Sequence, residues 1–373
     1  MPFGRKKEAQ QPHNDSAFKW CVGANPTDVA AENHFVSSRG LLAVCDVRPC
    51  NPESSKDVLE GYPTELPSRA LSIYVCSVAL PNFVTNMLPH ITHSFVLVSG
   101  DCDEDIPFDV FPKPNQFTKL EEEEMVEFEA RLMLEKQERH RAGAHGQDHV
   151  DFRTLLETPK LLHWFCQNWC GGKHKKVTSI PIGLDYHTMA NKVKWGPSWS
   201  SCAEQERHIM EIRESSKPFW ERTAKVYGNY HFGTIDANFV VFKTRHPLVL
   251  HSYDRRDALL LCSDEVMEYE AEPLARVDTW RRQSQFAFVA SPHGCGLDCH
   301  RTWEALVLGC IPIVKRSKLD VLFEDLPVLL VDSWDQLTPD LLQQTIQDMK
   351  SKTFNQQKLF LSYWSNLIKS HLR

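Results

Sequence analysis

A single stretch, residues 286 to 314, limits the possible folds of this chain more than any other: FAFVASPHGCGLDCHRTWEALVLGCIPIV. Phe286 to Ala290 is an apolar run of strand length, and Ile311 to Val314 is a second one. The prolines and glycines of SPHGCG predict a turn after the first strand. The apolar spacing then predicts a helix from about Asp298 that ends at Gly309. The segment therefore predicts a strand–turn–helix–strand unit of an α/β protein.

A glycine-rich turn that leads into a helix can bind anions, because backbone N–H groups and the positive end of the helix dipole converge there. We expect the turn from His293 to Asp298 to bind a diphosphate, with Arg301 on its oxygens and Glu304 on sugar hydroxyls. Arg255 and Arg256 have two possible roles, phosphate ligand or surface cation. The predicted donor-binding residues, two of which flank an earlier strand, are Ser291, His293, Gly294, Gly296, Leu297, Asp298, Arg301, Glu304, Lys225 and Asn229.

Length and composition indicate a globular protein of two domains. A chain of 373 residues is too long for one ordinary core, and 42% hydrophobic with 24% charged residues is typical of soluble proteins. The formal net charge of −7 argues against general binding to nucleic acid or to anionic membranes. The 12 cysteines are scattered without a disulfide framework, so we expect reduced, mostly buried thiols.

The cellular location is predicted from what the chain lacks. No apolar run approaches the span of a bilayer, and the start, MPFGRKKEAQQPHNDS, has no apolar signal-peptide core. If Met1 is the true start, we expect a cytoplasmic protein. A Golgi-lumen location would require the sequence to be a fragment of a longer chain.

Strand-like and helical runs alternate in both halves, which predicts two α/β domains. Strands are expected over residues 41–45, 72–77, 94–98, 177–182, 225–230, 286–290, 311–314 and 327–331, and helices over 81–88, 119–141, 155–169, 202–214, 254–262, 339–349 and 357–372. The expected organisation is a disordered tail (1–16), an N-terminal domain (17–190) with a charged helical insertion (115–150), a crossover (191–220), a nucleotide-binding domain (221–350) and a C-terminal helix (351–373).

The last third of the chain resembles a known family. The segment SPHGCGLDCHRTWEALVLGCIPIV and the following FEDLPVLLVDSWDQLTPDLL are similar to the donor-binding core of exostosin-type glycosyltransferases. Matching positions are Ser291, Pro292, Gly294, Arg301, Glu304, Gly309, Ile311 and Pro312. FVLVSGDCDEDIP and LLHWFCQNW with VTSIPIGLDYHT look like the small, membrane-free exostosin-like enzymes of large algal viruses and protists, one of which is a xylosyltransferase.

The resemblance implies two Rossmann-like domains that face a cleft, the GT-B arrangement. It also implies a UDP-sugar donor, inversion at the anomeric carbon, no obligatory metal or other cofactor, and a glycan or glycoprotein hydroxyl as acceptor. Xylose is favoured as the sugar by analogy with one relative alone.

Inverting transfer requires a base near the acceptor hydroxyl. Asp101 and Asp103 follow the strand over 94–98, and crowded carboxylates can raise one another's pKa toward the working pH. Either is a candidate for the catalytic base. Asp185 and His187 follow the strand over 177–182 and are predicted on the acceptor side, with His187 as an alternative base.

Other functions remain open from the sequence. The Asp-x-Asp of GDCDED could hold a divalent metal in a single-domain transferase. A zinc site at His293, Cys295, Cys299 and His300 would lack a second, separated ligand pair. A nicotinamide site would need a third glycine after Gly294 and Gly296. A catalytically silent nucleotide- or carbohydrate-binding protein of the same fold is the alternative from another class.

Overall fold

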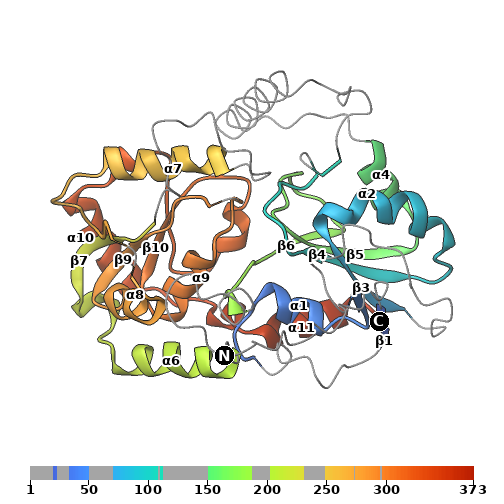
Figure 1. Ribbon diagram of the computed structural model, residues 1–373, viewed down its shortest axis with the longest axis horizontal. Coiled ribbons are helices and arrows are strands. Elements are labelled where there is room, and N and C mark those ends of the chain that lie inside the picture. Colours follow the sequence, from blue (N-terminus) through green and yellow to red (C-terminus); the bar gives the residue numbers. More distant parts are fainter. Residues whose placement is uncertain are drawn as a thin grey trace, which may run out of the picture.

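The protein has two halves, each built on its own β-sheet with helices packed around it (Figure 1). The computed structural model describes residues 20–22, 33–49, 70–107, 110–111, 150–186, 202–230, 248–272, 274–294 and 296–373. The predicted tail (1–16), the helix predicted over 119–141 and His187 lie outside these residues. The structure is therefore α/β, as the sequence predicts.

The first sheet contains six strands in sequential order. They are β1 (Trp20–Val22), β2 (Val47–Pro49), β3 (Leu71–Cys76), β4 (Phe95–Gly100), β5 (Leu161–Gln167) and β6 (Val177–Ile180). The β1–β2 pair is antiparallel, and the others are parallel. The carboxyl ends of β2 to β6 therefore lie along one edge of the sheet, where α/β proteins bind ligands.

The second sheet is parallel throughout and has the order β11-β10-β9-β7-β8. Its strands are β7 (Thr223–Gly228), β8 (Met267–Tyr269), β9 (Phe286–Ala290), β10 (Ile311–Lys315) and β11 (Leu329–Val331). The strands predicted over 225–230, 286–290, 311–314 and 327–331 are confirmed. Gly309 has a φ of +73°, which confirms it as the residue that ends the helix before β10.

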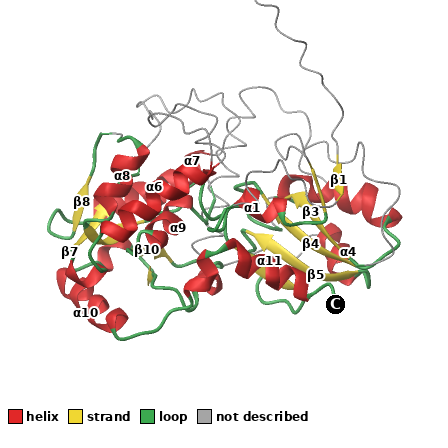
Figure 2. Ribbon diagram, turned by 90° about the horizontal axis from the view of Figure 1, so that it is seen from below, coloured by secondary structure: helices red, strands yellow, loops and turns green. Residues whose placement is uncertain are grey.

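The three longest helices, α6, α7 and α10, belong to the second half (Figure 2). They are α1 (Ser38–Ala43), α2 (Leu80–Asn82), α4 (Val150–Glu157), α6 (Cys202–Ser215), α7 (Leu248–Leu261), α8 (Arg276–Gln283), α9 (His300–Val307), α10 (Pro339–Lys350) and α11 (Leu361–Ser370). Short 3-10 or π turns lie at Ser77–Ala79, Phe83–Met87, Leu88–His90, Phe219–Glu221, Asp320–Phe323, Trp334–Gln336 and Gln356–Leu359. Among the described helices, none combines the length and the apolarity that crossing a bilayer demands.

Two predicted elements of the first half are wrong. Residues 41–45, predicted as a strand, largely belong to α1, which begins where the Ser37 side chain accepts a hydrogen bond from the Gly40 N–H. The helix predicted over 155–169 is instead the end of α4 followed by β5, which pairs with β4 and β6. Residues 41–45 and the β5 part of the second run are almost wholly buried, so their hydrophobic pattern has no period that separates strand from helix.

Two helices far apart in the sequence join the halves. Glu206 of α6 accepts hydrogen bonds from the backbone N–H groups of His34 and Phe35 and from the Tyr186 hydroxyl. The last helix, α11, returns to the first half, where the Leu361 N–H donates to the His34 carbonyl. Residues of both halves also share one buried apolar cluster, so their relative placement is supported by packing.

Gly183, after β6, is a position that only glycine fits. Its φ is +66°, and a Cβ there would lie 2.1 Å from the Val36 carbonyl oxygen. We expect Gly183→Ala to lower the free energy of unfolding by about 2 kcal/mol or more, from backbone strain plus the clash. Gly172→Ala, with a φ of +79° but open space around the Cβ, should cost only about 1 kcal/mol. Equal losses in urea unfolding would contradict the steric argument.

Candidate functional site

The loops that follow β5 and β6 contact the turn that follows β9. The Asp298 N–H donates to the Asn168 side-chain oxygen at 3.2 Å. The Ile182 N–H donates to an Asp298 carboxylate oxygen at 2.7 Å, and the His300 Nδ1 lies 2.7 Å from the Gly183 carbonyl oxygen. The carboxyl-end loops of the two sheets thus meet at the segment that the sequence singles out.

Asp298 is the buried centre of this contact. One carboxylate oxygen accepts from Ile182 and the other from the Trp303 indole at 2.8 Å. Burial raises the pKa of Asp298 to about 6, although these hydrogen bonds oppose the increase. Asp298, predicted as a donor ligand, therefore has both oxygens engaged by the protein and acts as a bridge between the halves.

Asp298 should make stability depend on pH. Its folded-state pKa of about 6 exceeds the usual 3.8, so between these values the folded chain holds a proton that the unfolded chain has lost. The stability that Asp298 contributes is therefore present below about pH 4 and is lost as the pH rises to about 6, by at most roughly 3 kcal/mol. Urea unfolding at stepped pH should show a steeper decline in wild type than in Asp298→Asn. Identical slopes would contradict this.

Three backbone N–H groups of the glycine turn already donate hydrogen bonds within the protein. The His293 N–H donates to Asp254 of α7 at 2.8 Å, and the Gly294 N–H donates to the Gly296 carbonyl at 3.0 Å. The Asp298 N–H donates to Asn168. The expectation that the whole run from His293 to Asp298 offers amides to a diphosphate is therefore corrected for these three residues. The reason is that the turn itself is held to α7 and to the first half by its backbone.

Two guanidinium groups converge on the turn. The Arg301 Nε donates to the Asn229 carbonyl at 3.1 Å, and its guanidinium lies over the Tyr230 ring. Arg255 of α7 lies 3.3 Å from the position that a Cβ would take at Gly294. Burial lowers the pKa of Arg301, and the nearby charge of Arg255 lowers it further. The site therefore holds two cations close together, a placement that an anion would stabilise.

The His293 side chain, in the same turn, is held on both sides by other residues. The His293 ring lies between Asp254, at 3.7 Å, and the Lys315 carbonyl, at 3.3 Å. Asp254 also accepts from the Trp334 indole at 2.8 Å and lies 3.7 Å from the Lys315 ammonium. His293 is thus fixed by α7 and β10, next to the predicted phosphate position.

Glu304 is held by the second half itself. One of its oxygens pairs with Arg276 of α8, and the other accepts from the Trp280 indole at 2.9 Å. Arg276 also donates to the Asp185 carbonyl of the first half at 2.7 Å. Each Glu304 oxygen can accept one more hydrogen bond, so a ribose hydroxyl could bind beside Arg276 and Trp280. Ribose binding by Glu304 stays a prediction. The acceptor-side role of Asp185 also stays a prediction.

One predicted donor ligand lies at the wrong edge of the sheet. The Lys225 ammonium donates to the Asp264 carbonyl, in the loop before β8, at 3.0 Å. Because β7 and β8 are parallel, this loop is at the amino-end edge, away from the glycine turn. Asn229, which follows β7, is at the carboxyl-end edge and contacts Arg301. The prediction for Lys225 is therefore corrected, and that for Asn229 stays open.

Ser291 and Leu297, two further residues of the turn, contact other parts of the protein. The Ser291 hydroxyl bonds the Thr302 hydroxyl at 2.7 Å, which ties the turn to α9. The Leu297 side chain is buried in the shared apolar cluster. Of the zinc alternative, Cys295 is outside the described residues, and the Cys299 thiol points to the Pro292 carbonyl.

The two candidate bases have different surroundings. Asp101 directly follows β4 and has a φ of +64°, and its carboxylate lies 3.5 Å from the Arg39 guanidinium of α1. Asp103 is exposed, and its carbonyl oxygen would lie 2.7 Å from a Cβ at Gly296. Of the two, Asp103 is the residue that lies against the glycine turn, and Gly296 is needed for this close approach.

Asn168 is a site residue that the sequence analysis missed. It follows β5, with a φ of +52°, and its amide nitrogen donates to the Cys102 carbonyl while its oxygen accepts from Asp298. It therefore joins the Asp101–Asp105 loop to the glycine turn. The rule that polar residues at carboxyl ends of strands form sites could have found it, had β5 been predicted as a strand.

Asn168 offers a clean substitution series. Asp keeps the acceptor and tolerates a positive φ, but it removes the donor to Cys102 and adds a negative charge near Asp298. Gly keeps only the backbone. We expect both variants to lose about 1–3 kcal/mol of unfolding free energy, because buried partners lose their bonds. Asn86→Asp, at an exposed site, is the control. An unchanged stability in both variants would contradict the bridging role.

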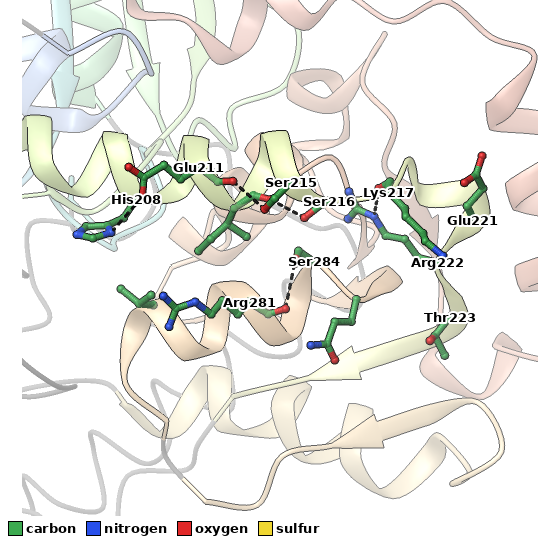
Figure 3. A pocket seen from close by; sticks show the side chains of 13 residues that line it. His208, Glu211, Ser215, Ser216, Lys217, Glu221, Arg222, Thr223, Arg281 and Ser284 are labelled. Carbon is green, nitrogen blue, oxygen red and sulfur yellow. Dashed lines mark hydrogen bonds and ion pairs between the residues drawn. The ribbon is translucent and has the colours of Figure 1, made fainter.

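A hollow of about 660 Å³ lies elsewhere, between α6, α8 and the start of β7 (Figure 3). Its charged side chains have both signs, with Arg222 and Arg281 beside Glu211 and Glu221. Arg222 donates to the Leu308 carbonyl at 2.9 Å, at the end of α9. None of the site residues predicted from the sequence lines it, so it does not form part of the candidate site.

Comparisons with known proteins give limited similarity. No protein-family model matches the chain, and no curated protein matches it. Among solved structures, AviGT4, a glycosyltransferase involved in avilamycin A biosynthesis, is 13% identical, with 80% of this chain and 88% of that chain covered and a TM-score of 0.27. The wall teichoic acid polymerase TagF is 10% identical, with 75% and 68% covered and a TM-score of 0.22. Similarity at this level establishes neither a shared fold nor a shared activity.

Proposed function

We propose that this chain is an exostosin-like glycosyltransferase of the GT-B type. It transfers a sugar from a UDP-sugar to a hydroxyl of a glycan or glycoprotein, with inversion and without an obligatory metal. UDP-xylose is the first donor to test, by the resemblance of the sequence. The observation that carries the proposal is the pair of guanidinium groups, Arg255 and Arg301, at the glycine turn between the two sheets.

The cation pair suits the leaving group. A nucleoside diphosphate gains negative charge as its bond to the sugar breaks, and fixed guanidinium groups stabilise this charge without reorganisation. Arg301 is held by the Asn229 carbonyl and Tyr230, so its orientation is set before a ligand arrives. Bidentate contacts from guanidinium to phosphate oxygens would replace the water that these partly enclosed cations have lost.

Asp103 is the proposed base, because it is the exposed carboxylate beside the turn. As the acceptor oxygen forms its bond to the anomeric carbon, the carboxylate takes the hydroxyl proton. The bond from that carbon to the phosphate oxygen breaks, and UDP leaves with the electron pair. Attack opposite to the leaving group inverts the anomeric configuration.

The metal-dependent alternative fits the loop less well. It needs both carboxylates of the Asp-x-Asp to face one ion, but Asp101 pairs with Arg39. A guanidinium at that distance occupies the place where a divalent cation would neutralise the charge. We therefore expect transfer to continue in EDTA.

A thermal-shift and hydrolysis screen against nucleotide sugars tests the proposal. A UDP-sugar should raise the melting temperature according to its affinity, and release of UDP should persist in EDTA. Binding without turnover in the presence of any acceptor would favour a silent binding protein. Turnover that EDTA stops would favour the metal-dependent reaction.

A further inference from the structure

A second concave surface lies between the halves, outside the glycine-turn site. It is a groove of about 530 Å³ with walls from β6 and the loop before it, from the segment around the 3-10 helix Asp320–Phe323, and from α11. None of its lining residues belongs to the glycine turn or to the Asp101–Asp105 loop. Any ligand of this groove is therefore separate from the proposed donor.

The charge of the groove has a single sign. Lys173, Lys318 and Lys358 line it, and no aspartate or glutamate does. The whole chain has a formal net charge of −7, so this concentration of cations contrasts with the average surface. The hollow in Figure 3, by comparison, mixes cations with Glu211 and Glu221. A positive concave surface attracts anions.

The positive charge of the groove comes from its lysines, because the pKa of His174 is lowered from the usual 6.5 and its ring is therefore neutral at pH 7. Burial lowers the pKa of His174, and the charges of Lys176 and Lys175 lower it further. Burial also lowers the pKa of Lys358, whose ammonium contacts the Glu324 carbonyl, although the carboxylates of Asp325 and Glu324 oppose this. An anion in the groove would offset the cost of placing these cations together.

The uncharged part of the lining suits a sugar. Thr178, Ser179 and Tyr363 carry hydroxyl groups, and Trp169 and Trp364 are also among the lining residues, although both are almost wholly buried. The volume lies within the usual range of small-ligand sites, about 300–1,000 Å³. We propose that the groove binds an anionic sugar, with its phosphate or sulfate groups on the lysines and its ring against the aromatic and hydroxyl side chains.

Calorimetric titration at fixed ionic strength tests the proposal. The probes are glucose 1,6-bisphosphate, a disulfated disaccharide, an uncharged disaccharide and inorganic sulfate. We expect one or both anionic sugars to bind, more weakly at high salt, and the uncharged sugar not to bind. If the bisphosphate binds more tightly than the disulfated sugar, the groove prefers phosphate groups. The opposite order would mean that it prefers sulfate groups.

Two double variants localise the binding. Lys173→Gln with Lys318→Gln removes two exposed cations that line the groove, and affinity should fall about tenfold. Lys350→Gln with Lys352→Gln removes two exposed cations that do not line it, and affinity should change less than twofold. Arg301→Ala should leave this binding unchanged, which separates the proposal from that of the donor site.

Several results would overturn the proposal. Equal losses in the two double variants would mean a diffuse field instead of a site. Sulfate that binds as tightly as the sugars would mean that the ring is not recognised. A hexaglutamate peptide that binds more tightly than either sugar, and loses affinity only in the groove variant, would assign the groove to an acidic protein segment. Absence of binding by every anionic sugar would also refute it.

Discussion

Arg301→Ala is expected to slow sugar transfer by about 10²–10³, because the leaving diphosphate loses a fixed cation. The thermal shift produced by UDP should also shrink. The melting temperature of the ligand-free protein should not fall, because the substitution removes a desolvated charge that lies near Arg255. Loss of function without loss of stability is typical of a residue placed for binding.

Matched variants sharpen this test. Arg301→Lys keeps the charge but cannot make the bidentate contact, so it should recover only part of the rate. Arg256→Ala removes an exposed cation one residue from Arg255 and should leave transfer unchanged. Steady-state release of UDP measures the three variants. A full rate in Arg301→Ala would contradict the proposed donor site.

Asp103→Asn is expected to reduce transfer by about 10²–10⁴ while UDP still raises the melting temperature, because only the proton acceptor is lost. The substitution keeps the size of the side chain. Its backbone oxygen, which approaches Gly296, is also unchanged. The measurement is the rate of UDP release with and without acceptor, beside a UDP thermal shift.

Asp101→Asn is the matched control for the base. Because Asp101 pairs with Arg39, this change should affect stability more than transfer. If Asp101→Asn abolishes transfer and Asp103→Asn does not, the assignment of the base is reversed. If neither does, the base lies elsewhere, and His187 becomes the next residue to replace.

The two halves of the protein differ in how far their sequence predicts their structure. In the second half, the turn residues of SPHGCG, the amphipathic spacing of α9 and Gly309 all favour the same elements, and β9 has the predicted bounds. In the first half, β5 and α1 are buried runs without periodicity, and both were predicted as the wrong element. Burial on all sides removes the pattern on which such predictions depend.

The candidate site shows the same division. The positions of Arg301 and Asn229 at one edge follow from strand ends that the sequence reveals. The roles of Asp298 and Glu304 do not, because a carboxylate can bind a ligand or the protein itself with the same chemistry. Only the contacts with Ile182 and Trp303, and with Arg276 and Trp280, decide between these uses.

By itself, the sequence determined the α/β class, the strand–turn–helix unit and the cation that follows it, because these depend on local spacing and turn chemistry. The tertiary structure alone decided that Arg255 lies near Arg301 and that Asn168 connects the Asp101–Asp105 loop to the glycine turn. It also decided that lysines from separate segments line one groove. Such groupings come from packing between residues far apart in the chain, and local periodicity carries no information about them.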